Sequence, residues 1–472
     1  MNRKILVIIL VIAIATRIAF LDARPMDHDE SIHAYLSYNL LNYNQYSYDP
    51  AFHGPFLYFA SAGIFGVLGD SEFTARLAPV IFSVIGVFAA CLFDRWFGKG
   101  AYIFAFLMVF SPSILYYSRY MRNDMILVGS FLVAVYCYFR YVSNEKEYLA
   151  YIAAVFVGVM LTAKENAYIY MFILVSFILL YGLYYKRLNY LSILIRWDWK
   201  KLRMVVISSL IVGSIFVSLY TAGFGDYGGL EDATVEAFSH WFTMHAEEDH
   251  AKQLWYYGNI LLQYEFLPLA LSIVSIPVFY RRLRKGESTK IEMFAAYWLF
   301  MSVLGYHVLS HKVPWLLVHL VAPLAFFGAI YSGSVFSWNR RAYRLAFVLI
   351  VAVTLVISLN ITYVDYNNAE EDLIYIQAQH STVELANVIE QKYNAGEEIA
   401  VYEPNNDYWP LPWYLREIDI GFYSSKWVEG IDYVVTSQDQ KSFVEDKGYE
   451  VVNEYEMRPN LYMYLMKQQS SN

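Results

Sequence analysis

The chain has 472 residues, of which 58% are hydrophobic and 18% aromatic, and its formal net charge is −8. Its mean hydropathy of +0.34 is higher than one soluble core requires, so the composition excludes an ordinary soluble domain and indicates a membrane protein. The sequence carries no nucleic-acid-binding signature, and its two cysteines, Cys91 and Cys137, have no metal-ligand spacing.

Apolar runs long enough to cross a membrane recur along the chain. The first, residues 5–21, contains Arg17 as its one charge and lacks the cleavage site of a signal peptide, so we expect a retained span. Ten further runs lie near residues 73–93, 101–117, 124–140, 148–163, 166–185, 204–222, 259–280, 291–309, 314–333 and 343–363. The pattern predicts an all-α membrane fold with about 11 transmembrane helices.

Basic residues gather at alternate junctions between these runs. If the N-terminus is cytoplasmic, the inner junctions hold most of the Lys and Arg residues, for example those within 186–203 and 281–290. An odd number of spans then places the C-terminus on the other side. We therefore expect a multi-pass protein of the cell membrane, with a cytoplasmic N-terminus and an extracytoplasmic C-terminal domain.

The tail beyond Tyr363 has a different pattern. A helix is predicted over residues 370–391, followed by short β-rich runs such as "EIAVYE", "IDYVVTS" and "LYMYLMK". From Asp365 onward there are 20 acidic and 7 basic residues, a balance typical of a solvated surface. We therefore divide the chain into a transmembrane domain, residues 1–364, and a small extracytoplasmic α/β domain, residues 365–472.

Four polar clusters fall on the outer side in this topology: "DHDESIHAY" (27–35), "YSRYMRND" (117–124), "TAKENA" (162–167) and "SHKVPW" (310–315). Charges near hydrocarbon are costly unless they are paired or face a wet cavity, so they are candidates for function. Any one cluster has an alternative interpretation as an interfacial anchor. The convergence of four clusters on one membrane face favours a functional site.

The first cluster predicts an amphipathic helix in the first outer loop. Asp29 and His33 are four residues apart and share one face, away from an apolar stripe that includes Ile32. Glu30 projects about 100° away around the helix, so it is better placed to brace a neighbour than to share the task of Asp29. The pattern predicts a carboxylate and an imidazole that point together into a cavity.

Several motifs then follow one another in an order seen in a known family. They are "HDESIHA" (28–34), "YDP" (48–50), "HGPF" (53–56), "TARL" (74–77), "SPS" (111–113), "YYSR" (116–119), "RND" (122–124), "TAKE" (162–165), "HKVPWLLVHLVAPLA" (311–325) and "PWYLRE" (412–417). In this order the chain resembles an archaeal membrane protein family described as flippase-activity-associated. That family looks like a branch of the GT-C glycosyltransferases, akin to protein O-mannosyltransferases and aminoarabinose transferases.

The resemblance implies a GT-C-like core and a glycosyltransferase that moves a sugar from a polyprenyl (dolichyl) phosphate to an acceptor hydroxyl, in protein or lipid-linked glycosylation. It carries the catalytic role onto Asp29, with Glu30 beside it and Asp124 as the second acidic position. Candidate substrate-binding residues are His33, His53, Arg119, Arg122, Lys164, Glu165, His311 and Lys312. The chain departs from the family where His311 replaces an acid, and the basic residues among the candidates are expected to face the lipid phosphate.

Two further points stay open from the sequence. The one cofactor suggested is a divalent metal, with Asp29, His33 and Asp124 as candidate ligands, although no spacing is diagnostic; the outer loop 239–250 offers more histidines. An alternative function is a flippase, or a flippase-associated factor, for lipid-linked sugars. It would need polar residues through the bilayer, whereas the mid-span positions are apolar. A structural or assembly partner would instead tolerate the loss of Asp29.

Overall fold

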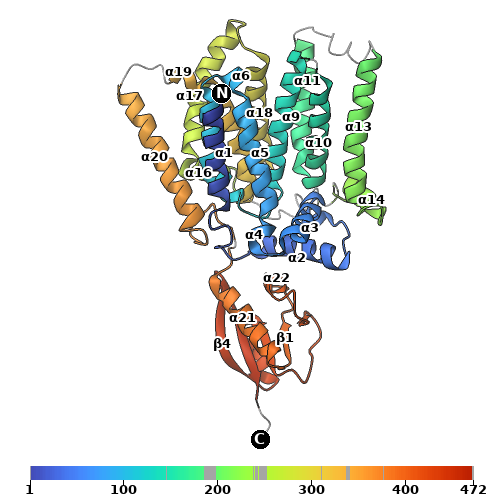
Figure 1. The fold of residues 1–472 in the computed structure, drawn as a ribbon. Helices are drawn as coiled ribbons and strands as arrows, with labels where there is room; N and C mark the ends of the chain where they lie inside the picture. The colour runs from blue at the N-terminus through green and yellow to red at the C-terminus, as the bar shows by residue number, and fades with distance from the viewer. Residues whose placement is uncertain are drawn as a thin grey trace.

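The computed structural model describes residues 2–469 except 145, 185–197, 238, 240–242, 244–251, 310, 336–340 and 376. Most of the outer loop 239–250 therefore lies outside the described residues. The chain forms a helical bundle with a small sheet domain beyond one of its ends (Figure 1). The N-terminus lies at the opposite end of the bundle from the sheet domain and the C-terminus (Figure 1).

The bundle contains a helix for each of the eleven predicted spans. They are α1 (Arg3–Ile18), α5 (Leu77–Leu92), α7 (Gly100–Phe110), α9 (Asp124–Asn144), α10 (Glu147–Ala163), α11 (Asn166–Tyr184), α13 (Trp199–Tyr220), α17 (Phe266–Arg284), α18 (Lys290–Val308), α19 (Val318–Val335) and α20 (Arg341–Tyr363). Eight helical segments in the described residues are long and apolar enough to cross a membrane, whereas α1, α7 and α10 have only 16, 11 and 17 residues. The multi-pass architecture is confirmed, and the number of crossings stays a prediction.

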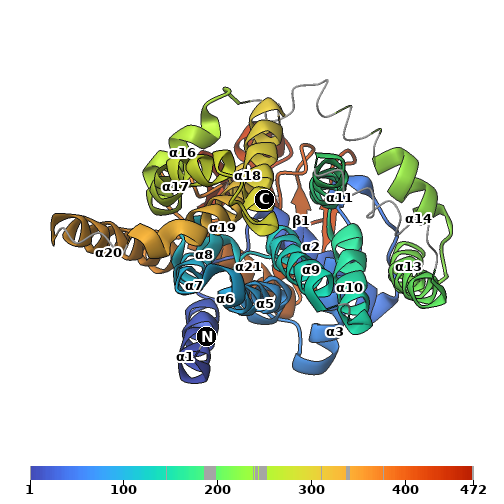
Figure 2. The same ribbon diagram turned by 90° about the horizontal axis from the view of Figure 1, so that it is seen from above.

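Helix α19 forms the centre of the bundle, since 89% of its apolar window is buried inside the protein. Its Phe326 packs edge-on against Phe93 in the turn after α5, Phe104 of α7 and Trp298 of α18. By contrast, only 6% of the window in α13 and 22% of that in α20 are buried. Seen from above, these two helices lie at opposite sides of the bundle (Figure 2). They are the helices that would meet most lipid.

The predicted span 101–117 is broken into two helices at the "SPS" motif. Helix α7 ends at Phe110, and α8 (Pro112–Tyr117) begins with proline, which has no N–H to donate to the carbonyl four residues earlier. Arg17 of α1 binds that carbonyl, Met108 O at 2.7 Å, and Val109 O at 3.0 Å. Glu265 accepts hydrogen bonds from Ser113 N at 2.7 Å and its hydroxyl at 2.6 Å. The backbone groups that the break leaves without helical partners are thus hydrogen-bonded by the buried side chains of Arg17 and Glu265.

Short helices connect the bundle at both ends. At the end nearest the sheet domain lie α2 (His28–Tyr43), α3 (Phe56–Leu68) and α4 (Glu72–Ala75) (Figure 1). The short turn η1 (Pro50–Phe52) falls between α2 and α3 in the chain. The remaining short elements are α6 (Asp94–Phe97), α14 (Gly228–Glu231), the π-helical turn η2 (Asp232–Glu236), α16 (Tyr256–Tyr264) and η3 (Pro314–Leu317).

The C-terminal domain is a five-stranded mixed sheet, in the order β2-β1-β3-β5-β4. Its strands are β1 (Ile399–Tyr402), β2 (Gly421–Tyr423), β3 (Tyr433–Ser437), β4 (Tyr449–Arg458) and β5 (Leu461–Gln468). Strand β1 pairs parallel to β2 and β3, and β5 pairs antiparallel to β3 and β4. The helices are α21 (His380–Asn394), α22 (Leu411–Tyr414), η4 (Gln438–Gln440) and α23 (Lys441–Asp446). The predicted helix 370–391 therefore begins ten residues later, at His380.

The sheet domain docks onto the short helices of the first loop. Tyr414 donates a hydrogen bond to Glu72 and accepts one from Met26 N at 2.8 Å. Arg416 binds the carboxylate of Asp70 at 2.6 Å. These contacts come from the "PWYLRE" motif, so one role of that motif is to hold the C-terminal domain against the end of the bundle that carries α2.

Candidate functional site

Helix α2 turns its two adjacent acids in different directions. The helix begins at His28, after Asp27, whose side chain accepts a hydrogen bond from Glu30 N at 2.7 Å and so caps the first turn. The side chain of Asp29 is 32% exposed, whereas that of Glu30 has no exposed surface. The predicted difference in direction between the two carboxylates is confirmed.

Glu30 lies in a closed cluster of arginines. Arg76 binds both of its oxygens at 2.9 Å, Arg24 binds one at 2.8 Å, and Met121 N donates to the same oxygen at 2.8 Å. Burial alone would raise the pKa of Glu30, but Arg24 and Arg76 outweigh it and lower the pKa. With its oxygens bound and buried, Glu30 is placed to hold α2 against α4 and α8 rather than to touch a substrate.

Asp29 faces a different arginine. Arg122 donates a hydrogen bond to its carboxylate, and the guanidinium lies 3.8 Å above the ring centroid of Trp315. Burial would raise the pKa of Asp29, but the charge of Arg122 lowers it below the ordinary value. Asp29 is therefore an ionised carboxylate at neutral pH, with part of its surface open.

Asp124, the first residue of α9, has two further partners. Lys164 Nζ and His319 Nε2 both lie 2.9 Å from its Oδ1 atom, and Arg122 Nε lies 3.9 Å from Oδ2. His319 Nδ1 lies 2.8 Å from the hydroxyl of Tyr170. A neutral His319 that donates from Nε2 to Asp124 accepts from Tyr170 at Nδ1, so the tautomer follows from its neighbours.

His319 is a member of the site that sequence reasoning missed. It is fully buried in α19, within an apolar run where periodicity indicates only packing. The available signal was its place in the motif "HKVPWLLVHLVAPLA". It belongs to the central helix, and so it ties Asp124 to the core of the bundle.

His53 and Glu165 form a second pair near Arg122. His53 Nδ1 lies 3.0 Å from Glu165 Oε2, and Arg122 reaches His53 Nε2 at 3.4 Å. Gly54 makes this possible, because a Cβ atom there would lie 2.3 Å from the carbonyl oxygen of Thr162. The "HGPF" motif can therefore pack directly against the C-terminal end of α10, two residues before Glu165.

His33 lies one turn after Asp29 on α2, and a hydrogen bond with Tyr58 fixes the orientation of its ring. Tyr58 donates its hydroxyl to Phe52 O at 2.7 Å and lies 2.7 Å from His33 Nδ1. Since the hydroxyl proton is used, His33 donates from Nδ1, and its Nε2 atom is the acceptor. Burial, and then Arg122, lower the pKa of His33 well below the ordinary value, so the imidazole is neutral.

Two predicted phosphate-binding residues, Arg119 and Lys312, donate hydrogen bonds to backbone carbonyls. Arg119 donates to the carbonyls of Thr16, Arg17, Ala19 and Phe20 at 2.7–3.2 Å, and so caps the end of α1. Lys312 is 3% exposed, and it donates to Leu309 O at 2.6 Å and Lys252 O at 3.4 Å. Within the described residues Lys312 has no carboxylate partner. His311 precedes it in the loop that delivers Trp315 to Arg122.

The sheet domain reaches α2 next to Asp29. Arg458 pairs with Asp407 at 2.5 Å and approaches His28 Nδ1 at 3.5 Å. The ring of Trp409 lies 5.8 Å from that of Tyr35, about two turns further along α2 than His28. The C-terminal domain thus packs against the face of α2 that carries His28 and Tyr35.

The metal candidates do not form a ligand cluster. In the ranges that the structure describes, no group of three or more His, Cys, Asp or Glu side chains is arranged to hold a metal ion. Among the candidates, Asp29 is bound by Arg122 and Asp124 by Lys164, so cations already neutralise their charge. The residues present therefore fit an anion better than a divalent cation.

Comparison with known proteins agrees with this architecture. Residues 52–218 match the family model "Dolichyl-phosphate-mannose-protein mannosyltransferase". The structure of ArnT from Cupriavidus metallidurans bound to undecaprenyl phosphate superposes with a TM-score of 0.71 at 16% identity, over 98% of each chain. The chain has an ArnT-like GT-C fold.

Other matches were also found among solved structures. The apo state of the same ArnT gives a TM-score of 0.67 at 15% identity, again over 98% of each chain. The S. cerevisiae Pmt1-Pmt2 complex bound to the sugar donor gives 0.37 at 17% identity, over 49% of this chain and 34% of that one. No match was found among curated proteins. Together, the family model and the ArnT-like fold indicate a glycosyltransferase of the GT-C type.

Proposed function

We propose that this glycosyltransferase takes its sugar from a polyprenyl-phosphate donor and transfers it to an acceptor hydroxyl at the outer face of the membrane. The observation that carries the proposal is the setting of Asp29, an ionised and partly exposed carboxylate held by Arg122 beside Asp124 and Lys164. The ArnT structure with undecaprenyl phosphate, and the family model named after dolichyl-phosphate-mannose, support this class of donor.

The proposed reaction needs one base. Asp29 accepts the proton of the acceptor hydroxyl while that oxygen attacks the anomeric carbon of the donor sugar. The bond between the anomeric carbon and the phosphate oxygen breaks, and its electron pair leaves with the lipid phosphate. A low pKa suits this base, because Asp29 must be unprotonated, and positioning of the hydroxyl then decides its efficiency.

The leaving phosphate needs cations. Arg122 bridges Asp29 and Asp124, so its guanidinium lies between the base and the second acidic residue. Lys164 is held by Asp124, and Lys312 has no carboxylate partner in the described residues. We assign the lipid phosphate to these three side chains. Removing one such donor from a site of this kind typically costs about 3–4 kcal/mol of transition-state stabilisation.

The membrane orientation is part of the proposal. The site and the sheet domain lie at the end of the bundle opposite to the N-terminus (Figure 1). The distribution of Lys and Arg places the N-terminus in the cytoplasm, which puts Asp29 and the domain of residues 365–472 outside. Within the GT-C superfamily, the motif order supports the archaeal flippase-activity-associated branch, in which we place this chain.

The deciding experiment is sugar transfer in reconstituted vesicles from radiolabelled polyprenyl-phosphate sugars. We expect Asp29→Asn, which removes the base and little else, to lower the transfer rate by about 10²- to 10⁴-fold. Donor binding should persist in this variant. The matched control is Asp22→Asn, which changes an exposed carboxylate of the same loop, and it should transfer at the wild-type rate.

Two results would overturn the proposal. Transfer by Asp29→Asn at the wild-type rate would exclude Asp29 as the base. Wild-type protein that consumes no donor, but moves labelled lipid between leaflets, would replace the transferase with the flippase.

A further inference from the structure

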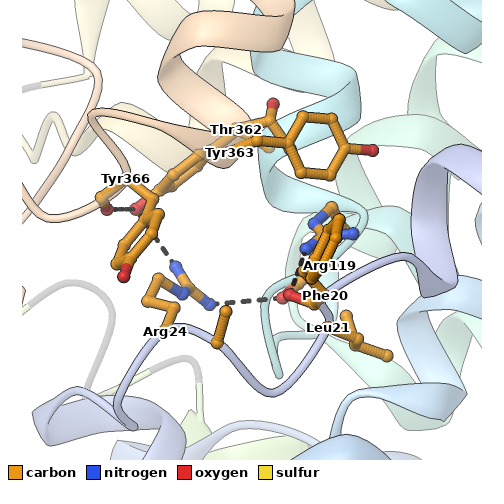
Figure 3. A pocket seen from close by; sticks show the side chains of 9 residues that line it. Phe20, Leu21, Arg24, Arg119, Thr362, Tyr363 and Tyr366 are labelled. Carbon is orange, nitrogen blue, oxygen red and sulfur yellow. Dashed lines mark hydrogen bonds between the residues drawn. The ribbon is translucent and has the colours of Figure 1, made fainter.

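A polar pocket lies on the side of Glu30 away from Asp29. It encloses about 340 Å³, its open mouth included. Figure 3 shows Arg24 and Arg119 facing each other across it, with residues of α20 above them. Its lining comes from the end of α1, from α8 and from the end of α20: Phe20, Leu21, Ala23, Arg24, Tyr116, Arg119, Thr362, Tyr363 and Tyr366.

Two cations, Arg24 and Arg119, line the pocket. Arg24 shares the carboxylate of Glu30 with Arg76, whereas the carboxylates of Asp27 and Asp22 act on Arg24 and Arg119 electrostatically without an ion-pair contact. Arg119 is bound only by carbonyl oxygens and has no carboxylate partner among the described residues. Two buried guanidinium groups that line one pocket, one sharing its carboxylate with a third arginine and the other contacting carbonyl oxygens, favour an anionic ligand.

The other walls suit a phosphate with an apolar attachment. Thr362 is 5% exposed, and among the described residues its hydroxyl has no hydrogen-bond partner. The ring of Tyr363 lies 4.8 Å from the Arg119 guanidinium, and that of Tyr116 lies 5.2 Å from Arg24. The aromatic rings therefore hold both cations at the edge of the pocket.

The position of the pocket indicates the source of the phosphate. It lies where α1 and α20 end together, since Tyr363 donates a hydrogen bond to Thr16 O. Phe20 at its edge is 74% exposed and has a φ of 51°, a conformation that is uncommon for a bulky side chain. On α20, Val356 is 68% exposed. An aromatic side chain next to exposed apolar helix faces is typical of the boundary between lipid and water.

We propose that this pocket binds the phosphate of an anionic membrane phospholipid, whose hydrocarbon chains lie along α1 and α20. The site is distinct from the donor site at Asp29, because Arg24 and Glu30 separate the two. Phosphate oxygens would accept hydrogen bonds from the guanidinium groups of Arg24 and Arg119. A bound lipid would thereby hold the end of α1 against α20, beside the segment that connects to the sheet domain.

The test uses the full chain, purified in detergent and stripped of lipid. Binding of phosphatidylglycerol is measured by native mass spectrometry, with phosphatidylcholine as the neutral comparison. Two substitutions of Arg119 separate the effect of its charge from that of its structural contacts. Arg119→Lys and Arg119→Gln both remove the guanidinium group that binds four carbonyl oxygens, but only Arg119→Gln removes the positive charge. We expect one phosphatidylglycerol on the wild type and on Arg119→Lys, and about 10-fold weaker binding by Arg119→Gln.

A third variant covers the case in which Arg119→Gln does not fold. Phe20→Asn keeps a residue type that tolerates the positive φ, and it should weaken lipid binding by removing the ring at the mouth. Equal binding by all variants, or equal binding of both phospholipids, overturns the proposal. Displacement by inorganic phosphate at millimolar concentration assigns the site to free phosphate, and displacement by undecaprenyl phosphate alone assigns it to the donor lipid; either also overturns the proposal.

The binding assay does not depend on the proposed function. Asp29→Asn should retain phosphatidylglycerol even though it loses transfer, since Asp29 does not line the pocket. Loss of lipid binding in Asp29→Asn would contradict the separation of the two sites.

Discussion

Asp29 and Glu30 are neighbours in the sequence, yet they lie in two opposite environments. Asp29 keeps 32% of its side chain exposed and contacts Arg122, which it shares with Asp124. Glu30 is fully enclosed by Arg24 and Arg76. One step of about 100° around α2 separates a carboxylate that can meet a substrate from one that joins four segments of the chain. Two acids in one motif therefore need not share one task.

The largest effect should come from Glu30→Gln. The substitution leaves two buried guanidinium groups without a counter-charge, and breaking a buried ion pair in this way typically costs about 3–5 kcal/mol of stability. We expect a large loss of folded protein, measured by the thermal transition in detergent. The folded fraction should keep its transfer rate per molecule.

Asp29→Asn provides the opposite pattern. Arg122 keeps Asp124, and Asp29 is partly exposed, so the change in stability should stay below about 1 kcal/mol while transfer is lost. If Glu30→Gln instead folds as well as the wild type and is inactive, the two residues share the chemistry and the distinction between them is wrong.

The second prediction concerns the contact that brings His53 to Glu165. In Gly54→Ala, the new Cβ atom would lie 2.3 Å from Thr162 O. The backbone of Gly54 is also tied to that segment, because Gly54 N donates a hydrogen bond to Ala163 O at 3.1 Å. We expect a loss of about 1–3 kcal/mol in stability, as for overpacking elsewhere, and a lower transfer rate. Thermal unfolding and transfer are measured on the same preparation.

The control is a glycine with space around it. Gly63 lies in α3, and a Cβ there meets no atom within 4 Å. Gly63→Ala should therefore be neutral or stabilise the protein by about 0.5–1 kcal/mol, the usual gain in a helix. Equal destabilisation by both substitutions would mean that the close approach at Gly54 is not what holds the loop.

Helices were the most predictable part of this protein. Apolar runs of spanning length report burial in lipid directly, and each of the eleven overlaps a helix. The break inside 101–117 was not predicted, because mean hydropathy does not register a single missing N–H at Pro112. The short strand β2 was also missed, since Gly421–Tyr423 has too few residues to show a period.

The residues of the candidate site could be predicted from the sequence only in part, because the direction of a side chain in an irregular turn is not encoded in the spacing of the residues. The motif order brought Asp29, Arg122, Asp124 and Lys164 into one candidate set, and the structure places them in contact. The sequence also predicts Arg119 as a member of the site, because it is only three residues before Arg122, but the structure places it elsewhere. Its guanidinium lies against α1, since the turn between α8 and α9 sends the two side chains in different directions. Direction around an irregular turn cannot be read from spacing.

The smallest expected effect is a pH dependence that separates the histidines from the acids. His33 and His53 both have a pKa below the ordinary value, chiefly because of burial. The unfolded chain therefore binds more protons than the folded one below about pH 6.5, and stability falls as the pH decreases from there. Asp29 and Glu165 also have lowered pKa values, but their contribution is lost only at more acidic pH.

Between pH 7 and pH 5 the loss of stability should thus come from histidines, and His33→Asn tests this. Its amide can donate to Tyr58 as Nδ1 does, but it cannot take up a proton. Groups that face His33 are Asp29, His53, Arg122 and Lys164. The thermal transition of His33→Asn should fall less between these pH values than that of the wild type, whereas His380→Asn, exposed on the sheet domain, should follow the wild type. If all three proteins lose stability equally, protonation of His33 does not oppose folding, and the imidazole beside Asp29 is not held neutral by its surroundings.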